Sequence, residues 1–256
     1  HARKKRLYRV CVFNQKETLS IMVNEEDHFR MQYLLSGLQL NNIWKFINEI
    51  DNEIEKKVTY AFSEKEGYLT SCPTNVGTGM RASIMLHLPA LAMVNGINDI
   101  LKAISKIGYV VRGFYGEGTE VMGNLFQVSN QITLGLSEEE IIDNLEKVNQ
   151  QIINKEQKVR KELLSNSKSQ LEDQTWRAYG ILSSVRIISS AEAMELLSKL
   201  RLGVGLGIIP HPNLGTLNKL MLLIQPASLQ MLAGKNLDPF SRDLQRAILI
   251  RDEISR

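Results

Sequence analysis

The residues best suited to chemistry form a short acidic segment, Asn24-Glu25-Glu26-Asp27-His28, with Arg30 two positions further along. The segment follows directly on residues 19–23, an apolar run typical of a buried strand. Carboxylates packed this densely are a poor fit to a hydrophobic core, because burying an unpaired charge is costly. The pattern therefore predicts a polar site at the end of a strand.

Three further segments carry residues suited to binding phosphate or a guanidinium. Residues 70–81 read TSCPTNVGTGMR and contain Cys72 directly before a proline. Residues 112–118 read RGFYGEG, and their glycines permit a loop that closes over bound ligands. Residues 242–247 read RDLQRA and fall in a predicted helix, where arginines four positions apart share one face.

In their order along the chain, the acidic segment, residues 70–81 and residues 112–118 resemble the catalytic domain of the guanidino kinases, the family of creatine and arginine kinases. The resemblance runs from about Leu19 to the C-terminus. Residues 242–247 are similar to the phosphoarginine-receptor motif of the bacterial protein-arginine kinases, which narrows the match to that branch. The resemblance implies ATP-dependent phosphorylation of arginine side chains in proteins.

Phosphoryl transfer to a guanidinium needs groups that orient an acceptor whose permanent charge makes it a poor nucleophile. A pair of carboxylates binds the guanidinium nitrogens, fixes their orientation and accepts the proton that leaves. Glu26 and Glu117 occupy the positions of the family's two acceptor-binding glutamates. Cys72 resembles the family's reactive cysteine, in a supporting role, and Glu25 would contact a metal ion only through water. The nearby competitors for the carboxylate roles are Glu25, Asp27 and Glu120.

The resemblance also implies an ATP-binding surface. Arg30, Arg81 and Arg112 would hold the phosphates, because the planar fork of arginine binds phosphate oxygens through two hydrogen bonds. Met85 stands where many family members have a histidine, so the adenine contact is expected to be apolar. The remaining predicted ATP-binding residues are Ala82, Ser83, Ile84, Gly113, Phe114, Tyr115, Gly116 and Glu117.

The segment at 242–247 is predicted to be an allosteric phosphoarginine-binding site, distinct from the catalytic one. Arg242 and Arg246 would grip the phosphate, and Asp243 would hold the guanidinium of the ligand. The other residues of the motif are Leu244, Gln245 and Ala247.

Each of these residue types also has an ordinary structural interpretation. A loop carboxylate is usually a solvated charge, a lone arginine is usually a surface residue, and a lone cysteine in a strand is usually a small buried hydrophobe. An Arg–Asp–Arg helix face is usually a solvated network within the helix. We set these interpretations aside because the motifs coincide in one chain. Cys11 is predicted to be structural, His28 to support the acidic segment by hydrogen bonding, and His87 and His211 to be incidental.

Composition bounds the function further. The chain has 256 residues, is 43% hydrophobic and 23% charged, and contains no apolar run long enough to span a membrane. A net charge of +3 gives no reason to expect direct nucleic-acid binding, and the basic residues 3–6 are predicted to be a solvated terminus. Two cysteines do not indicate a disulfide framework, which fits a cytoplasmic protein.

The resemblance implies the cofactors and partners. ATP with magnesium is the expected cofactor pair. The expected substrates are proteins with exposed arginines, including a heat-shock repressor and a Clp ATPase, and phosphorylation would mark proteins for the Clp protease. A zinc-binding activator protein and homodimerisation through the helical part are also implied. Because the family's N-terminal helical domain has no counterpart here, the chain is expected to be a fragment.

Hydrophobic periodicity and the resemblance together predict an α+β fold, an antiparallel sheet flanked by helices with a helical C-terminal portion. Residues 1–165 would form the catalytic domain and residues 166–256 the helical region that carries the receptor motif. Strands are expected over 17–23, 67–71, 80–88, 108–112 and 125–134. Helices are expected over 40–58, 89–106, 137–164, 167–184, 190–201, 214–224 and 241–255, with a loop at the glycines of residues 203–207.

Two other functions fit parts of the sequence. A phosphagen kinase acting on free arginine would share the catalytic motifs, but residues 242–247 argue against it. A non-catalytic phosphoarginine-binding module would keep the receptor motif without turnover. Comparing protein and free arginine as acceptors separates the two enzymes, and titration with nucleotide and phosphoarginine separates both from the binding module.

Overall fold

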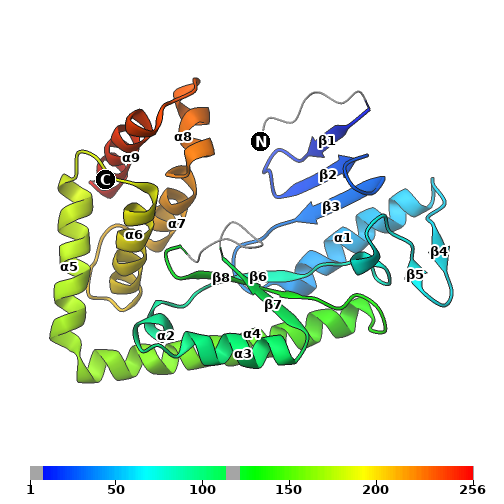
Figure 1. The fold of residues 1–256 in the computed structure, drawn as a ribbon, viewed down its shortest axis with the longest axis horizontal. Helices are drawn as coiled ribbons and strands as arrows, with labels where there is room; N and C mark the ends of the chain where they lie inside the picture. Colours follow the sequence, from blue (N-terminus) through cyan, green and yellow to red (C-terminus); the bar gives the residue numbers. More distant parts are fainter. Residues whose placement is uncertain (1–7, 114–121, 256) are drawn as a thin grey trace. The chain divides into compact units, whose positions relative to one another are not determined.

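The computed structural model describes residues 8–113 and 122–255, and it is an α+β protein, as predicted (Figure 1). The strands are β1 Val10–Phe13, β2 Leu19–Val23, β3 Phe29–Tyr33, β4 Phe62–Ser63, β5 Gly67–Tyr68, β6 Ser83–His87, β7 Tyr109–Arg112 and β8 Leu125–Asn130. The helices are α1 Leu40–Glu55, α2 Pro89–Met93, α3 Ile97–Lys106, α4 Glu138–Asn166, α5 Lys168–Ser184, α6 Ser190–Gly205, α7 Leu214–Leu223, α8 Pro226–Ala233 and α9 Pro239–Ile254, with a short 3-10 turn at Pro73–Asn75.

The chain divides into two compact units, which we describe separately. The sheet unit comprises the chain up to Ile84 together with Ile104–Val110 and Val128–Gln150. The helical unit comprises Met85–Ala103, Val111–Gln127 and the chain from Gln151 onward. The predicted division into residues 1–165 and 166–256 stays a prediction.

An antiparallel meander, β1-β2-β3, begins the sheet unit (Figure 1). Ile21 pairs with Met31 and Val23 with Phe29, so one face of the meander is apolar. Helix α1 packs on this face, where Tyr33 stacks on Phe46 with ring centroids 4.4 Å apart. The helix forms there because its apolar residues recur at three- and four-residue spacings.

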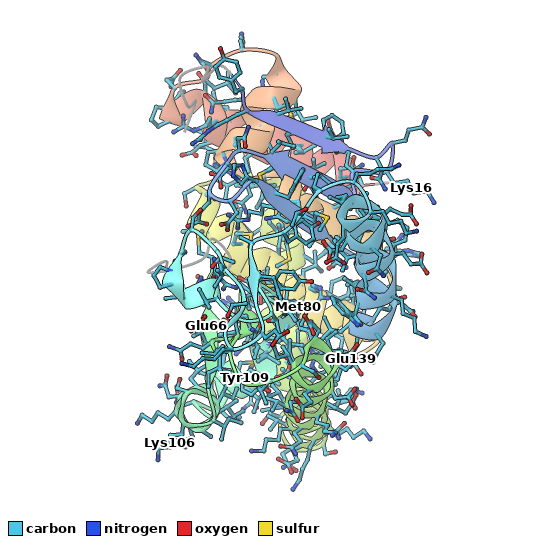
Figure 2. All side chains as sticks on the ribbon, turned by 90° about the vertical axis from the view of Figure 1, so that its right-hand side faces the viewer. Lys16, Glu66, Met80, Lys106, Tyr109 and Glu139 are labelled. Atoms are coloured by element: carbon cyan, nitrogen blue, oxygen red, sulfur yellow. The ribbon has the colours of Figure 1, made fainter. Side chains whose placement is uncertain are left out.

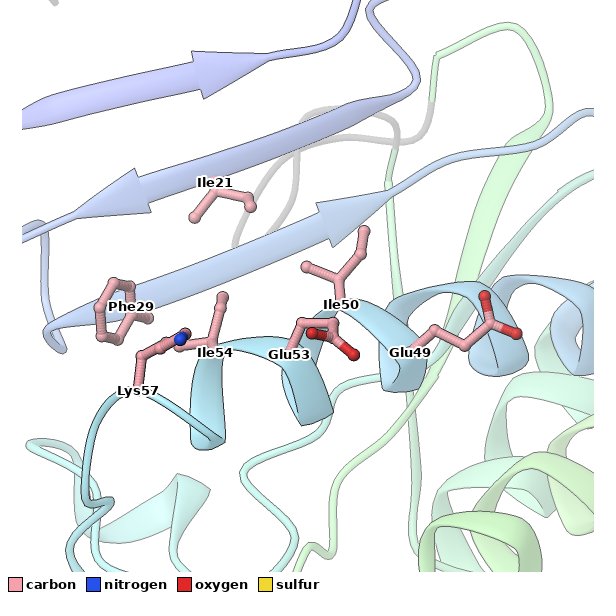
Figure 3. Close-up of a pocket in the computed structure, with 7 residues that line it drawn as sticks. All are labelled: Ile21, Phe29, Glu49, Ile50, Glu53, Ile54 and Lys57. Carbon is pink, nitrogen blue, oxygen red and sulfur yellow. The ribbon is translucent and has the colours of Figure 1, made fainter.

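Part of the contact between α1 and the meander is open, and a shallow hollow of about 520 Å³ lies there (Figure 3). Its floor is apolar, and the charged side chains of α1 stand at its rim. It is lined by Ile21, Phe29, Glu49, Ile50, Glu53, Ile54 and Lys57. Because successive side chains of a strand point to opposite faces, Arg30 projects from the face of β3 opposite to Phe29 and the hollow. The predicted phosphate-binding arginine therefore does not belong to this hollow.

The amino-terminal part of α4 closes the sheet unit, and its start is fixed by a reciprocal cap. Ser137 Oγ accepts a hydrogen bond from the Glu140 amide, and a Glu140 carboxylate oxygen accepts one from the Ser137 amide. The next residue, Glu139, accepts a hydrogen bond from the indole of Trp44 at 3.3 Å, which ties α4 to α1. Glu139 is visible at the start of this helix, whereas Lys106 projects outward from the last turn of α3 (Figure 2).

The core of the helical unit is an apolar cluster supplied mainly by α5, α6, α7 and α9. Its members include Leu182, Leu197, Leu200, Leu217 and Ile250, each with no exposed side chain. Side-chain caps begin three of these helices, at Ser189, Asn213 and Asp238.

A hydrogen-bonded polar group, with the buried Ser198 at its centre, lies in this apolar unit. The Nε2 atom of His87 lies 2.8 Å from the hydroxyl of Ser198, and the amide of Asn124 donates to the same hydroxyl at 2.9 Å. His87 therefore has a structural contact, while its lack of a chemical role stays a prediction. The sequence does not reveal this contact, because Ser198 lies 111 positions away from His87 in the chain.

The structure corrects several predicted boundaries. The helix expected over 89–106 is two helices, because Asn95 has a left-handed backbone (φ 55°) between α2 and α3. The last predicted strand ends at Asn130 instead of residue 134, and β1, β3 and α8 were not predicted. The loop expected at the glycines is wrong for Gly203 and Gly205, which continue α6.

Gly203 continues α6 because two helices meet there. A Cβ atom added at Gly203 would lie 2.7 Å from the Cβ atom of Thr175 on α5. No side chain fits at that distance without movement, so glycine is required by packing despite its low helix propensity.

This packing predicts opposite effects for two Gly→Ala changes in neighbouring helices. Gly203→Ala should lower the free energy of unfolding by roughly 1–3 kcal/mol through overpacking. Gly180→Ala on α5, where an added Cβ meets nothing within 4 Å, should raise it by up to about 1 kcal/mol through helix propensity. Urea denaturation of both variants is the measurement, and a shared sign would contradict the packing argument.

Burial of His87 predicts a dependence of stability on pH. Desolvation lowers the pKa of His87 well below its ordinary value, and the positive charges of Arg201 and Arg160 act in the same direction. The folded state therefore keeps the imidazole neutral, while the unfolded chain binds a proton below about pH 6.5. This contribution is fully present above that pH and is lost as the pH falls.

The test is urea denaturation at about pH 7.5 and about pH 5.5, for the wild type and for His87→Gln. The wild type should lose more stability on acidification than the variant, by up to roughly 1.4 kcal/mol per pH unit in the range where His87 contributes. Equal losses in both proteins would show that His87 does not titrate on unfolding.

Candidate functional site

The acidic segment forms the connection between β2 and β3. Asn24 adopts a left-handed backbone (φ 56°), and its amide donates to the carbonyl of His28 at 3.0 Å. The side chain of Asn24 also bonds the ring of His28 at 3.1 Å and donates to the carbonyl of Tyr8. His28 thus holds the shape of the turn by hydrogen bonding, which is the supporting role expected from the sequence.

Both glutamates of this turn face the guanidinium of Arg30. The Nη1 atom of Arg30 lies 3.7 Å from a carboxylate oxygen of Glu25 and 4.0 Å from one of Glu26. The side chains of Arg30 and Glu26 are about half exposed, at 50% and 47%. An ion pair this exposed is worth only about 0–1 kcal/mol, so a ligand can replace Glu26 beside Arg30 at small cost.

One hydrogen bond joins the acidic turn to the segment that contains Cys72. The carboxylate of Asp27 accepts from the backbone amide of Ser71 at 2.6 Å, across 44 positions of sequence. Asp27 was considered as a competitor for a carboxylate role, and the structure places it in this contact. Cys72 follows directly, so the bond brings two of the predicted catalytic residues, Glu26 and Cys72, into one region of the sheet unit.

The surroundings of Cys72 suit a supporting role. It is a free, half-buried cysteine at the start of the 3-10 turn Pro73–Asn75, and its sulfur lies 3.0 Å from the hydroxyl of Thr74. Either the thiol or the hydroxyl can donate in this contact, which fixes the position of the sulfur. The backbone carbonyl of Cys72 accepts from the hydroxyl of Thr70 at 2.7 Å, which fixes the turn from its other side.

The segment that follows is pinned to residues just beyond β8. The hydroxyl of Thr133 donates toward the carbonyls of Thr74 and Val76, and the amide of Thr78 donates to the carbonyl of Thr133. Gly77 has φ 113°, and a Cβ atom there would lie 2.1 Å from the carbonyl oxygen of Thr133. Only glycine permits this approach.

Arg81 is directed by the same part of the sheet unit. Its guanidinium donates to the hydroxyl of Ser129, a fully buried residue of β8, at 3.1 Å. The side chain of Asn130 receives the amide of Ala82 at 2.8 Å and donates to the carbonyl of Met80 at 3.1 Å. The sequence did not predict the roles of Ser129 and Asn130. Their partners lie about 50 positions earlier in the chain, and no local pattern indicates such contacts.

The other predicted ATP-binding residues fall in several places. Ser83 and Ile84 are half-buried in β6, and Met85 is 42% exposed, as an apolar contact with a ligand requires. Arg112 ends β7 and is half-buried, and Gly113 is buried; both belong to the helical unit. Phe114, Tyr115, Gly116, Glu117 and Glu120 lie outside the described residues.

No metal site is preformed within residues 8–113 and 122–255, where no group of three His, Cys, Asp or Glu side chains could hold an ion. The described residues therefore fit magnesium that arrives with ATP. Such an ion is held mainly by phosphate oxygens and water, with few protein ligands. Glu25 is the carboxylate that could hold such an ion through water.

The motif at 242–247 lies on α9, and its arginines are occupied by backbone carbonyls. Arg246 is 1% exposed; it donates to the carbonyls of Ile224 and Ile188 at 2.9 and 2.8 Å, and to Asp243 at 2.5 Å. Arg242 donates to the carbonyl of Leu237 at 2.7 Å. The alternative of a solvated network is wrong for Arg246. The receptor role stays a prediction, and a bound phosphate would have to compete with these contacts.

The fold and the site define a class of protein, the ATP:guanido phosphotransferases. Residues 1–159 match the family described as ATP:guanido phosphotransferase, C-terminal catalytic domain. The solved structure of lombricine kinase is similar, with a TM-score of 0.53 and 30% identity, covering 58% of this chain and 42% of that one. The duplicated taurocyamine kinase from Schistosoma mansoni, solved with transition state analog components, has a TM-score of 0.52 and 34% identity, covering 57% of this chain and 20% of that one.

The particular branch follows from the rest of the chain. Residues 168–256 match the family described as Protein-arginine kinase McsB C-terminal domain. The chain is 53% identical over 244 residues to the protein-arginine kinase of Bacillus pumilus, covering 95% of this chain and 67% of that protein. The relatives from Geobacillus sp. strain WCH70 and Halothermothrix orenii are 54% and 52% identical, each over 95% of this chain, covering 67% and 70% of those proteins. The chain belongs to the protein-arginine kinase family, as its motifs predicted.

The chain spans about two thirds of the length of these curated relatives. Within the part that the structure describes, no helix is both long enough and apolar enough to cross a membrane.

The contact between Asp27 and Ser71 predicts a change in thiol reactivity. Asp27→Ala should free the Cys72 segment and speed modification of Cys72 by Ellman's reagent about threefold or more, since removing a hydrogen bond to a charged group costs roughly 1.5–3 kcal/mol before discounting for exposure. Asp27→Asn keeps an acceptor oxygen and should react nearly as the wild type does. Both are made in a Cys11→Ser background, because Cys11 is exposed. Equal rates in all three proteins would show that the contact does not hold Cys72.

Proposed function

We propose that this chain is the catalytic and C-terminal part of an ATP-dependent protein-arginine kinase, which transfers the γ-phosphoryl group of ATP to arginine side chains in proteins. The observation that carries the proposal is the bond between Asp27 and Ser71. It joins the carboxylates that suit a guanidinium acceptor to the cysteine segment, beside an arginine that suits phosphate. The names of the relatives and the match of both halves of the chain support the same activity.

The acceptor must be oriented and must lose a proton. A nitrogen of the substrate guanidinium attacks the γ-phosphorus, the new N–P bond forms, and the bond from phosphorus to the oxygen of ADP breaks. Glu26, with Glu117, would bind the guanidinium through charge-assisted hydrogen bonds and receive the proton lost from the attacking nitrogen. Cys72 would add negative character beside the same acceptor.

The donor must be held and its charge screened. Arg30, Arg81 and Arg112 would bind phosphate oxygens, and Met85 would contact the base. Magnesium, bound with ATP and held by Glu25 through water, would neutralise part of the phosphate charge. Arg30 is well placed to exchange a glutamate for a phosphate, since it is half exposed and its contacts with Glu25 and Glu26 are 3.7 and 4.0 Å long.

The match of residues 168–256 to the protein-arginine kinase C-terminal domain favours protein substrates over free arginine. The proposal includes the wider role that this family membership suggests, with a heat-shock repressor and Clp ATPase among the substrates and marking for the Clp protease as the outcome. It also includes a zinc-binding activator, a homodimer, a cytoplasmic location and stimulation by phosphoarginine at Arg242–Ala247. The non-catalytic phosphoarginine-binding module remains the second candidate.

A substitution that removes one carboxylate tests the acceptor role. Glu26→Gln should lower kcat for arginine phosphorylation by well over tenfold, which is more than about 1.4 kcal/mol of barrier. ATP affinity should stay nearly unchanged, because the lost interaction acts chiefly in the transition state. Glu49→Gln serves as the matched control. It removes an exposed glutamate from α1, at the hollow on the face of the meander opposite to Arg30.

The measurement is transfer of labelled phosphate from ATP to an arginine-bearing protein and, in parallel, to free arginine, with calorimetry for ATP binding. Retention of more than about a tenth of wild-type turnover in Glu26→Gln would remove the assigned role. Labelling of free arginine alone would favour the phosphagen kinase. Absence of turnover in the wild-type chain, with intact binding of phosphoarginine, would favour the binding module.

A further inference from the structure

Ser198 is a polar residue in an otherwise apolar stretch of α6. It has no exposed surface, and its neighbours Leu197 and Leu200 are equally buried in the core of the helical unit. Its hydroxyl lies 2.8 Å from Nε2 of His87 and accepts a hydrogen bond from the side-chain amide of Asn124 at 2.9 Å. A hydroxyl has one donor and two acceptor sites, so it can serve both partners at once.

The backbone around Asn124 is shaped to sit on α6. Gly123 and Asn124 both have left-handed backbones, with φ 62° and 55°. A Cβ atom at Gly123 would lie 2.9 Å from the carbonyl oxygen of Met194, one helical turn before Ser198. The carbonyl of Asn124 also accepts the amide of Leu88 at 2.9 Å. Residues 123–124 and 87–88 are therefore held together on one short stretch of α6.

Both held positions adjoin the residues assigned to phosphoryl transfer. His87 is the last residue of β6 and comes two positions after Met85. Asn124 directly precedes β8 and comes seven positions after Glu117 in the sequence. The three-residue cluster His87, Asn124 and Ser198 thus holds the end of β6, next to Met85, and the residue before β8 on the core of the helical unit.

We infer that Ser198 is a positioning residue for phosphoryl transfer: through His87 it fixes the end of β6 beside Met85, and through Asn124 it fixes the start of β8. The inference rests on the proposed function. Its physical basis is that a buried serine costs desolvation that a leucine or alanine would avoid, while catalysis is sensitive to displacements of about 1 Å in groups remote from the reacting atoms. Ser198 touches no reacting atom and acts only through its two partners.

The kinetic test uses two single variants and their combination in the full chain. Ser198→Ala removes the hydroxyl, and Asn124→Gly removes the amide while keeping a residue that tolerates the left-handed backbone. Each should lower kcat for phosphorylation of an arginine-bearing protein by about tenfold or more, with the KM for ATP changed less than about twofold. The double variant should be no worse than the more impaired single variant, because both remove the same contact.

Thr175→Val is the matched control. It also removes a fully buried hydroxyl from the helical unit, but among the residues that the structure describes Thr175 bonds carbonyls of its own helix, those of Leu171 and Glu172. It should leave kcat within about twofold of the wild type. An equal kinetic loss in Thr175→Val, or losses that multiply in the double variant, would overturn the inference in favour of general destabilisation.

Hydrogen exchange separates this inference from the proposed function. In the unliganded chain, Ser198→Ala should speed exchange of the Leu88 amide, which is bonded to Asn124, while Thr175→Val should not. If the wild-type chain fails to phosphorylate arginine but this exchange pattern holds, the proposed function fails and the anchoring by Ser198 stands. Unchanged exchange at Leu88 in Ser198→Ala would overturn the anchoring whatever the activity.

Discussion

The hydrogen bond from the amide of Ser71 to the carboxylate of Asp27 is the contact on which the candidate site depends. It links the turn between β2 and β3 to the segment of Cys72 across 44 positions of sequence. Charge-assisted bonds of this type are roughly twice as strong as neutral ones, and this one is 2.6 Å long. The Asp27 carboxylate thus holds the Cys72 segment against the turn, while Glu25 and Glu26 both face Arg30.

Arginine serves three physical purposes in this chain, and sequence position alone does not separate them. Arg30 is half exposed and weakly paired with glutamates, so it is available to an anionic ligand. Arg81 donates a hydrogen bond to the buried hydroxyl of Ser129, which directs its guanidinium toward β8. Arg246 is buried and joins α9 to Ile224 and Ile188. Removing its guanidinium would leave the carbonyls of Ile224 and Ile188 without this donor, so loss of phosphoarginine binding in an Arg246 variant would have to be separated from loss of packing.

The sequence predicted the fold class, the family and the elements with strong local signals. The helices expected over 40–58 and 137–164 rest on local signals, and both appear in the structure as α1 and α4. The sequence did not predict the break between α2 and α3. The break depends on the left-handed backbone of Asn95, a conformation that asparagine can adopt but that its presence does not indicate. Gly203 was misassigned to a loop for the opposite reason: its place in α6 is set by Thr175 on another helix. The motif residues were found by resemblance, but Ser129, Asn130 and Ser198 act through partners that are 48 to 111 positions away.

The helical unit is more than a support for the motif on α9. One surface of α6 bears Met194 and Ser198, which contact Gly123 and Asn124, while Met194 also receives a hydrogen bond from Gln225 at 3.3 Å. Gln225 follows Ile224, whose carbonyl is bound by Arg246. Contacts of this kind transmit a change only if one element has two arrangements of similar free energy. The bond between Arg246 and Ile224 is the natural place for such an element, because a phosphate bound by Arg246 would compete for the same guanidinium that now holds the end of α7.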